Sequence, residues 1–316
     1  MIYRNSTKLC THRGWPSVKR VVSVSLGSST RNSVGEAEIL GQKVRMERIG
    51  TDGDMQKLLN LLRELDGQVD AIGTGGIKLH VHTAGKAFPL RGSKQVANAV
   101  KHTPLVDGSG LKDTIERRAF YIMEEHGIPI KGTKTLLMSA IDRFGMAETL
   151  WEMQADVIYG DFMFGLNLPI PVRKLSTVWF YGSLVGPFLR FIPFNWLYPT
   201  GKKQEQTTPR WEKYYQWADL ITGDFHYIRR YMPKRLDDKI IVTNTVTEAD
   251  VQDLRQRGVK LLVTGSPETN GRSFATNVLE AALVAVAGKN RPLTHAEYDE
   301  LLDSMGYQPR LEYLQG

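Results

Sequence analysis

The sequence has almost none of the residues that make disulfide bridges and sulfur-ligated metal sites. Its 316 residues include one cysteine, Cys10, which excludes an intramolecular disulfide and a cysteine-rich zinc or iron–sulfur site. His80 and His82 share one face of a predicted strand, but no third ligand accompanies them. The sequence therefore predicts no metal site, and it contains neither a Walker loop nor a G-x-S-x-G elbow.

Positive charge is also scarce once the first 20 residues are set aside. Those residues carry +5 and contain no acid, whereas the rest of the chain carries only +2 of the total of +7. A short basic segment is not a nucleic-acid-binding groove, and no nucleic-acid-binding motif follows it. The segment also lacks the continuous apolar stretch of a secretory signal. We expect residues 1–18 to form a flexible tail on a cytoplasmic protein that binds no nucleic acid.

Length and composition favour two globular domains. Apolar residues make up 41% of the chain and charged residues 24%, which is ordinary for a soluble globular protein. Strands that alternate with helices and end in glycine-rich turns predict an α/β fold. We expect an α/β substrate domain over residues 19–130, a doubly wound Rossmann-like domain over 131–290, and a helical tail over 291–316.

An aromatic insertion, residues 163–217, interrupts the second domain. Its apolar part, 175–198, is long enough to cross a bilayer, but two prolines and an arginine argue against a membrane-spanning helix. We therefore expect no membrane span, and a broken helix or loop in place of one rigid helix. The segment either lies buried between domains or protomers or covers the active site. We expect it to close part of a cleft between Asp161 and Asp224 and to contribute to a homodimer.

A repeated segment marks two predicted strand ends. Residues 155–162 reappear in similar form as residues 218–225, and in both an apolar run ends in Gly-Asp. Duplicated units or two strands that converged on one solution would both explain the repeat. In either case Asp161 and Asp224 are predicted at the carboxyl ends of parallel strands, where open α/β sheets bind ligands.

The best-placed candidate for cofactor binding is the segment 139–147. A dinucleotide fold needs a strand, a tight turn, a helix N-terminus for the pyrophosphate, and an acid about 20 residues further on for the ribose. Asp161 has this spacing from Asp142, although only Gly145 of the G-x-G-x-x-G fingerprint is kept. We expect Arg143 to reach the phosphate, and Asp161 to select NAD over NADP by repelling a 2′-phosphate. The alternative is that Asp142 caps a helix in an α/β domain that binds no nucleotide.

Polar residues at two later strand ends extend this predicted site. Thr243, Asn244 and Thr264 can hydrogen-bond a nicotinamide amide, a ribose or a substrate hydroxyl, or can satisfy only the turn backbone. Arg272 makes the start of the last long helix attractive to an anion. The predicted cofactor-binding residues are Asp142, Arg143, Phe144, Gly145, Met146, Asp161, Thr243, Asn244 and Thr264.

The candidate catalytic residues follow glycine-rich turns of the first domain. Asp107 opens one such turn, and Lys112 follows it in a predicted helix. An aspartate and a lysine held together can relay a proton to or from a hydroxyl or carbonyl group. Lys78, which follows the other turn, is the competing catalytic lysine. The alternative is a solvated helix face on which Lys112, Glu116 and Arg117 form ion pairs.

Five short segments carry a resemblance to a known family. They are Ser23-Val-Ser-Leu-Gly-Ser28, Val106-Asp-Gly-Ser-Gly-Leu-Lys112, Asp142-Arg-Phe-Gly-Met-Ala147, Thr222-Gly-Asp-Phe225 and Gly271-Arg-Ser-Phe274. Over most of its length the chain resembles bacterial quinate 5-dehydrogenase-like proteins, loose relatives of the shikimate/quinate dehydrogenase group. The resemblance implies an N-terminal substrate domain, a C-terminal Rossmann domain and hydride transfer at the cleft between them. The Asn-Val-Thr-x-Pro-x-Lys segment and the Gly-Ala-Gly-Gly loop of typical shikimate dehydrogenases are both absent here.

Together these features predict an NAD(P)-dependent oxidoreductase of a small, quinate- or shikimate-like hydroxylated carboxylic acid. The nicotinamide would carry the hydride, and Asp107 with Lys112 or Lys78 would handle the hydroxyl proton. Two alternatives stay open. One is a non-redox α/β enzyme or transferase with a phosphorylated or aromatic substrate, and the other is a ligand-binding regulatory protein with a degenerate Rossmann domain. The predicted substrate-binding residues are Arg117, Asp224 and Arg272.

Overall fold

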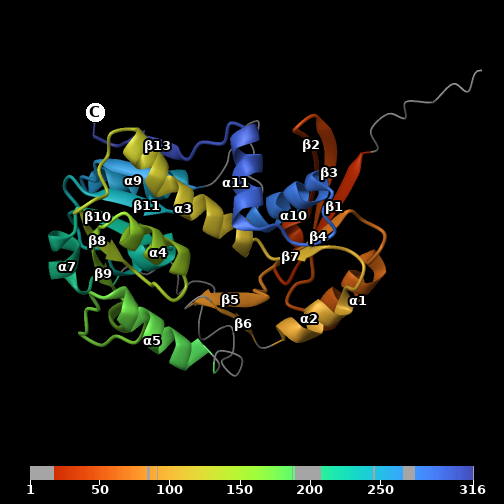
Figure 1. The fold of residues 1–316 in the computed structure, drawn as a ribbon, viewed down its shortest axis with the longest axis horizontal. Helices are drawn as coiled ribbons and strands as arrows, with labels where there is room; N and C mark the ends of the chain where they lie inside the picture. The colour runs from red at the N-terminus through yellow and green to blue at the C-terminus, as the bar shows by residue number, and fades with distance from the viewer. Residues whose placement is uncertain are drawn as a thin grey trace, which may run out of the picture.

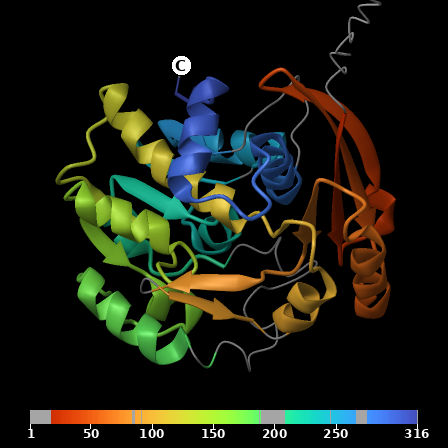
Figure 2. The same cartoon turned by 45° about the vertical axis from the view of Figure 1, so that its right-hand side comes forward.

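Two separate, mostly parallel β-sheets form the framework of the chain (Figure 1). Helices cover both faces of each sheet, so the fold is α/β as predicted. The sheets lie at opposite ends of the molecule, with helices α3 and α11 between them in both views (Figures 1 and 2). The computed structural model describes residues 18–83, 86–90, 92–186, 188, 208–244, 246–265 and 275–315.

The first sheet has five strands in the order β2-β3-β1-β4-β7. Only β2 runs antiparallel to its neighbour, and this edge strand is absent from the sequence-based prediction. A separate hairpin, β5–β6, confirms the strand predicted to carry His80 and His82. The bounds are β1 Lys19–Ser25, β2 Ser33–Ile39, β3 Gln42–Gly50, β4 Ala71–Gly75, β5 His80–Thr83, β6 Lys86–Pro89 and β7 Leu105–Val106.

Helices from both halves of the chain cover the first sheet. Helices α1 (Met55–Leu65) and α2 (Ser93–Ala99) pack on one face, and α1 begins where the Asp54 carboxylate accepts from Lys57 N. Helix α10 (Thr276–Ala287) packs on the other face. The predicted place of α10 in the C-terminal domain is therefore wrong. Its small apolar residues fit closely against β1 and β4, a tertiary preference that periodicity alone does not reveal.

The second sheet has six strands in the order β13-β12-β11-β10-β8-β9. Five of them are parallel, and the C-terminal β13 pairs antiparallel with β12. The bounds are β8 Lys134–Leu137, β9 Asp156–Tyr159, β10 Leu220–Gly223, β11 Ile240–Thr243, β12 Leu261–Thr264 and β13 Arg310–Tyr313.

Two sets of helices bury the faces of the second sheet. Apolar side chains of α3 (Ser109–Glu125), α4 (Phe144–Glu152) and α5 (Leu175–Val185) pack on one face. Those of α7 (Glu212–Trp217), α8 (Phe225–Tyr231) and α9 (Glu248–Gln256) pack on the other. Because its neighbours include α4, α10 and α11, helix α3 connects the two halves of the molecule.

The repeated segment of the sequence brackets β8. Its two copies form β9 and β10, which pair with β8 on opposite sides. Asp161 and Asp224 follow these strands directly, so both lie at the carboxyl end of the sheet, as predicted. Asp161 opens a single π-helical turn, Asp161–Gly165, and Asp224 is the N-cap of α8.

Part of the aromatic insertion is helical. Residues 175–185 form α5, where the sequence predicts a broken helix or a loop, because both prolines lie beyond the end of this helix. Three parts of the predictions lie outside the described residues: residues 1–17 of the predicted tail, residues 187 and 189–207 of the insertion, and Arg272. No helix in the described part of the chain is long and apolar enough to cross a membrane.

The predicted C-terminal tail contacts both halves of the molecule. Helix α11 (His295–Ser304) begins with a capping box between Thr294 and Glu297 and packs on α3. Tyr298 and Leu302 of α11 join the core that covers the first sheet, while β13 completes the second. The C-terminal segment therefore contacts both sheets, the first through α11 and the second through β13.

Candidate active site

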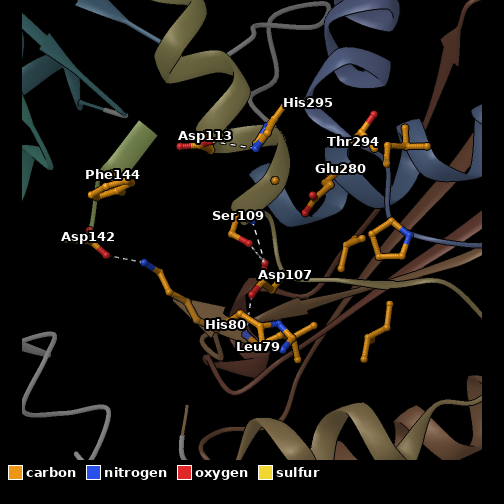
Figure 3. Close-up of a pocket in the computed structure, with 16 residues that line it drawn as sticks. Leu79, His80, Asp107, Ser109, Asp113, Asp142, Phe144, Glu280, Thr294 and His295 are labelled. Carbon is orange, nitrogen blue, oxygen red and sulfur yellow. Dashed lines mark hydrogen bonds and ion pairs between the residues drawn. The ribbon is translucent and has the colours of Figure 1, made fainter. Parts of the chain in front are cut away.

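A cleft between the carboxyl ends of β4, β7 and β8 holds two adjoining cavities. The larger has a volume of about 450 Å³ and the smaller about 280 Å³. Both are lined by Lys78, Asp107, Ser109, Asp113 and Asp142, so these five residues lie between the two cavities. Figure 3 shows the larger cavity, with the side chains of Asp107, Asp142 and Glu280 around it.

Asp107 joins the two glycine-rich turns of the first half. Its Oδ1 accepts from Ser109 N at 2.9 Å and from Ser109 Oγ at 2.5 Å, and its Oδ2 accepts from Leu79 N at 2.6 Å (Figure 3). The structure thus places this predicted catalytic residue in the cleft. Because three protein donors already occupy its carboxylate, Asp107 is suited to positioning Lys78 and the start of α3.

The start of α3 is held by an acid from another helix. Glu280 of α10 accepts hydrogen bonds from Gly108 N, Leu111 N and Tyr298 Oη, the last at 2.7 Å. Burial raises the pKa of Glu280 to about 7, an effect that the Tyr298 hydrogen bond opposes and the charge of Asp107 supports. Gly108 has φ 89°, and a Cβ there would lie 2.9 Å from Asn277 N. A glycine is therefore required where α10 approaches the turn.

Charged side chains form a continuous cluster on the floor of the cleft. Lys78 Nζ donates to Asp142 Oδ1 at 2.6 Å, and Arg143 Nε lies 3.3 Å from Asp142 Oδ2. Arg143 also donates to Glu116 and, at 2.5 Å, to Asp224 Oδ2. Burial raises the pKa of Asp142, but Lys78, Arg143 and Lys112 outweigh it and hold the pKa well below its usual range. Asp142 is therefore ionised.

Of the two lysines in this cluster, Lys112 has the more weakly paired amine. Its Nζ lies 3.9 Å from Glu116 Oε1, beyond hydrogen-bond distance. Burial and the nearby charge of Arg143 lower the pKa of Lys112 to about 8, although Glu116 and Asp142 oppose the shift. The predicted lysine therefore lines the smaller cavity with an amine that can exchange a proton near neutral pH.

The loop between β8 and α4 does not fit the pyrophosphate of a dinucleotide. Asp161 accepts from Ala140 N at 3.0 Å and Ile141 N at 2.9 Å, the amides that would face a phosphate. Ser139 Oγ and Tyr181 Oη donate to the same carboxylate, so its four lone-pair positions are all filled. Burial raises the pKa of Asp161, and these four hydrogen bonds oppose that shift. A ribose hydroxyl would have to displace one of them.

Carboxylates also surround the start of α4. A Cβ on Gly145 would lie 1.8 Å from Asp113 Oδ1, so Asp113 packs directly over this helix. Arg117 pairs with Asp113 at 3.0 Å and Glu148 at 2.6 Å, joining α3 to α4, and it does not line either cavity. Arg143, the cation predicted to reach a phosphate, is held by three carboxylates. Negative charge at this position would repel a phosphate.

The other predicted cofactor residues make contacts within the protein. Thr243 Oγ1 donates to Gly223 O at 2.7 Å, and Asn244 bridges Phe225 N and Asp224 Oδ2. Asp224 caps α8 and pairs with Arg143, and it lines neither cavity. Thr264 and Met146 are buried, whereas Phe144 lines the larger cavity. Of the predicted residues, the cleft brings together Asp107, Lys112, Lys78, Asp142, Arg143 and Phe144.

Sequence reasoning missed several residues of the cleft. His295 Nε2 lies 3.2 Å from Asp113 Oδ2, and its Nδ1 lies 2.8 Å from Thr114 Oγ1, which links α11 to α3. Glu280 is a lone acid in an otherwise apolar helix, a signal that could have marked it. Nothing local to His295 points to the cleft. Among the described residues, no group of three His, Cys, Asp or Glu side chains could hold a metal ion.

Comparisons with known proteins divide the chain at the start of α3. Residues 20–107 match the family model described as Domain of unknown function (DUF8753), and residues 110–314 match Domain of unknown function (DUF8754). No curated protein sequence matches the chain.

Several solved structures are similar at low identity. A putative malic enzyme (malate oxidoreductase) is 11% identical over 90% of this chain and 76% of its own, with a TM-score of 0.42. A glutamate dehydrogenase from Thermus thermophilus is 12% identical over 92% and 73%, with a TM-score of 0.41. A galactofuranose binding protein is 12% identical over 94% and 95%, with a TM-score of 0.36. Values this low support no conclusion about what the chain binds or does.

Proposed function

The chain belongs to the family described as Domain of unknown function (DUF8754), and we propose its function from the residues that line the cleft. The protein is an enzyme that binds a small hydroxylated carboxylic acid and moves a proton at the substrate hydroxyl through Lys112. The observation that carries this proposal is the position of Lys112, whose weakly held amine lines a cavity and has a pKa of about 8. A group whose pKa lies near the working pH is suited to general acid–base catalysis.

The two cavities offer different chemistry to the two parts of such a substrate. The larger cavity presents the carboxylates of Asp107, Asp113 and Glu280 beside apolar side chains such as Phe144. Carboxylates accept hydrogen bonds from hydroxyl groups, and they would repel a phosphorylated substrate. Lys78, Asp107 and Asp113 line both cavities, and the smaller one adds the ammonium group of Lys112, which with Lys78 suits a carboxylate and the adjacent hydroxyl.

Oxidation of that hydroxyl by NAD(P) is the reaction that the family resemblance implies, and it is the second candidate function. The parallel order β9-β8-β10-β11-β12 supports it, because the connections change direction between β8 and β10, beside the cleft. Since the β8–α4 loop does not fit a pyrophosphate, a dinucleotide would have to bind elsewhere along the cleft. Titration of intrinsic tryptophan fluorescence with NADH and NADPH tests this candidate, and no response to either would exclude it.

A thermal-shift screen tests the main proposal. The probes are hydroxylated carboxylic acids, including quinate and shikimate, each paired with a polyol that lacks the carboxylate. We expect the acids to raise the melting temperature more than their paired polyols, because ligands that bind only the folded state stabilise it. The acid with the largest shift is then assayed for turnover. An equal response to acids and polyols would contradict the proposed substrate class.

A further inference from the structure

The two lysines of the cleft differ in how their amines are held. Lys78 Nζ donates to Asp142 Oδ1 at 2.6 Å. Lys112 Nζ makes no hydrogen bond within the described part of the chain, and its nearest carboxylate oxygen, on Glu116, is 3.9 Å away. Lys112 therefore presents to the smaller cavity an amine that is held only by a long ion pair with Glu116.

The surroundings of Lys112 also favour its neutral form. The Lys112 side chain is only partly exposed, and the cations Arg143 and Lys78 lie close enough to disfavour a third positive charge. With a pKa of about 8, roughly a tenth of Lys112 is a neutral amine at pH 7, whereas an ordinary lysine is almost wholly charged. A desolvated lysine beside other cations is the usual setting of a nucleophilic amine.

From this geometry we propose that Lys112 is a nucleophile that forms an imine with the carbonyl group of a small oxo acid bound in the smaller cavity. This activity rests on the proposed function in using the same lysine and the same cavity. It adds covalent chemistry, because a proton-transfer residue needs no bond to carbon. An oxo acid suits the cavity because its carboxylate can pair with Lys78 while its carbonyl carbon faces Lys112.

The step balances without an oxidant or a reductant. The lone pair of the neutral Lys112 amine forms a bond to the carbonyl carbon, and the C=O π electrons move to oxygen, which takes a proton. The nitrogen loses both of its protons, the oxygen takes a second proton and leaves as water, and the nitrogen electrons form the C=N bond. Glu116, whose Oε1 lies 3.9 Å from Lys112 Nζ and whose pKa is raised by burial, can exchange these protons.

Reductive trapping tests the proposal. The full-length protein is treated with glyoxylate and sodium cyanoborohydride across a pH series, and the labelled lysines are identified by peptide mass spectrometry. We expect Lys112 to be labelled before the exposed Lys57 and Lys131, with a half-maximal rate near pH 8. In denatured protein the preference should vanish. Labelling of Lys112 no faster than that of Lys57 and Lys131 in the folded protein would overturn the proposal.

Two variants separate this inference from the proposed function. Lys112→Arg should abolish the early label, whereas Lys78→Arg should retain it at Lys112, because arginine keeps the neighbouring positive charge. If hydroxy acids bind and Lys112→Arg stops their turnover, but Lys112 is never trapped, the imine is wrong and proton transfer stands. If Lys112 is trapped but no hydroxy acid binds, the imine stands and the proposed function is wrong.

Discussion

The starts of helices α3 and α4 follow similar strand–turn segments but present opposite chemistry. At the start of α3, the amides of Gly108 and Leu111 donate to Glu280, which comes from the distant helix α10. The side chain of Lys112 lines a cavity there. Before α4, the amides of Ala140 and Ile141 are satisfied by Asp161, and carboxylates surround the helix start. In both segments a distant carboxylate accepts hydrogen bonds from backbone amides, but only the first places a weakly paired lysine amine in a cavity.

The comparison shows that residues at the carboxyl end of a parallel strand can serve either ligand binding or the stability of a loop. The carboxyl end of a parallel strand is the usual ligand site. In the second sheet that position is filled by the protein's own acid, Asp161, so the loop serves stability. The proposed chemistry lies at the facing end of the first sheet, where Lys112 and Lys78 line the smaller cavity. Four variants test the comparison.

The largest expected effect is on turnover in Lys112→Met. Removal of a proton-transfer group costs a factor of about 10² to 10⁴ in rate, while the fold should persist because the Lys112 amine makes no hydrogen bond to any described residue. In the unmodified protein kcat/KM should rise with pH through about 8, since a base must be neutral to accept the hydroxyl proton. Steady-state assays of both proteins across pH measure this. Full activity in Lys112→Met would show that Lys112 of α3 is not the proton-transfer group.

Asp161→Ala should have the second-largest effect, on stability. It leaves buried donors at Ala140 and Ile141 without an acceptor, which costs about 3 kcal/mol of unfolding free energy. Urea denaturation measures the loss. NADH binding should not weaken, since Asp161 holds the loop and not a ribose. A stable variant that loses NADH binding would restore the role predicted from the sequence.

Gly145→Ala tests the close packing of α3 on α4. The new Cβ would overlap Asp113 Oδ1, at 1.8 Å, so Asp113 must shift and its pair with Arg117 is disturbed, at a cost of about 2 kcal/mol. The matched control is Gly165→Ala, whose Cβ meets nothing within 4 Å. Denaturation of both variants should show a loss only in the first. Equal stability would mean that the two helix starts are not packed as described.

The smallest effect is expected from Asp156→Ala, at the opposite end of β9 from Asp161. Its carboxylate forms an exposed ion pair with Arg173 at 3.1 Å, and both side chains are about half exposed. Exposed pairs contribute about 0.5 kcal/mol or less. Denaturation in low and high salt measures the change. A loss as large as that of Asp161→Ala would show that burial and hydrogen bonding do not distinguish the two acids.

Local signals in the sequence were enough to predict most elements of the fold. Alternating strands and glycine-rich turns predicted the α/β fold, and the repeated Gly-Asp segment predicted that Asp161 and Asp224 follow parallel strands. They also led to Asp107, which opens a glycine-rich turn, and to Lys112 and Lys78, which follow such turns. Such features depend on neighbours in the chain, which the sequence displays.

Features that depend on distant partners were not predicted. The spacing of Asp161 from Asp142 matches that of a ribose-binding acid, but only the folded loop shows that Ala140 and Ile141 already occupy its carboxylate. The packing of α10 on the first sheet and the reach of Glu280 to α3 likewise join residues far apart in sequence. Homodimer formation and NAD preference stay predictions.

The central claim is that a lysine at the start of α3 carries the chemistry, and one measurement tests it most directly. NMR titration of protein labelled with ¹³C at lysine Cε, with Lys112→Arg for assignment, reports the pKa of Lys112. We predict one signal that titrates near pH 8 and is missing from the variant, because burial and Arg143 disfavour the charged amine. Titration of Lys112 at the ordinary value of about 10.4 would contradict the account.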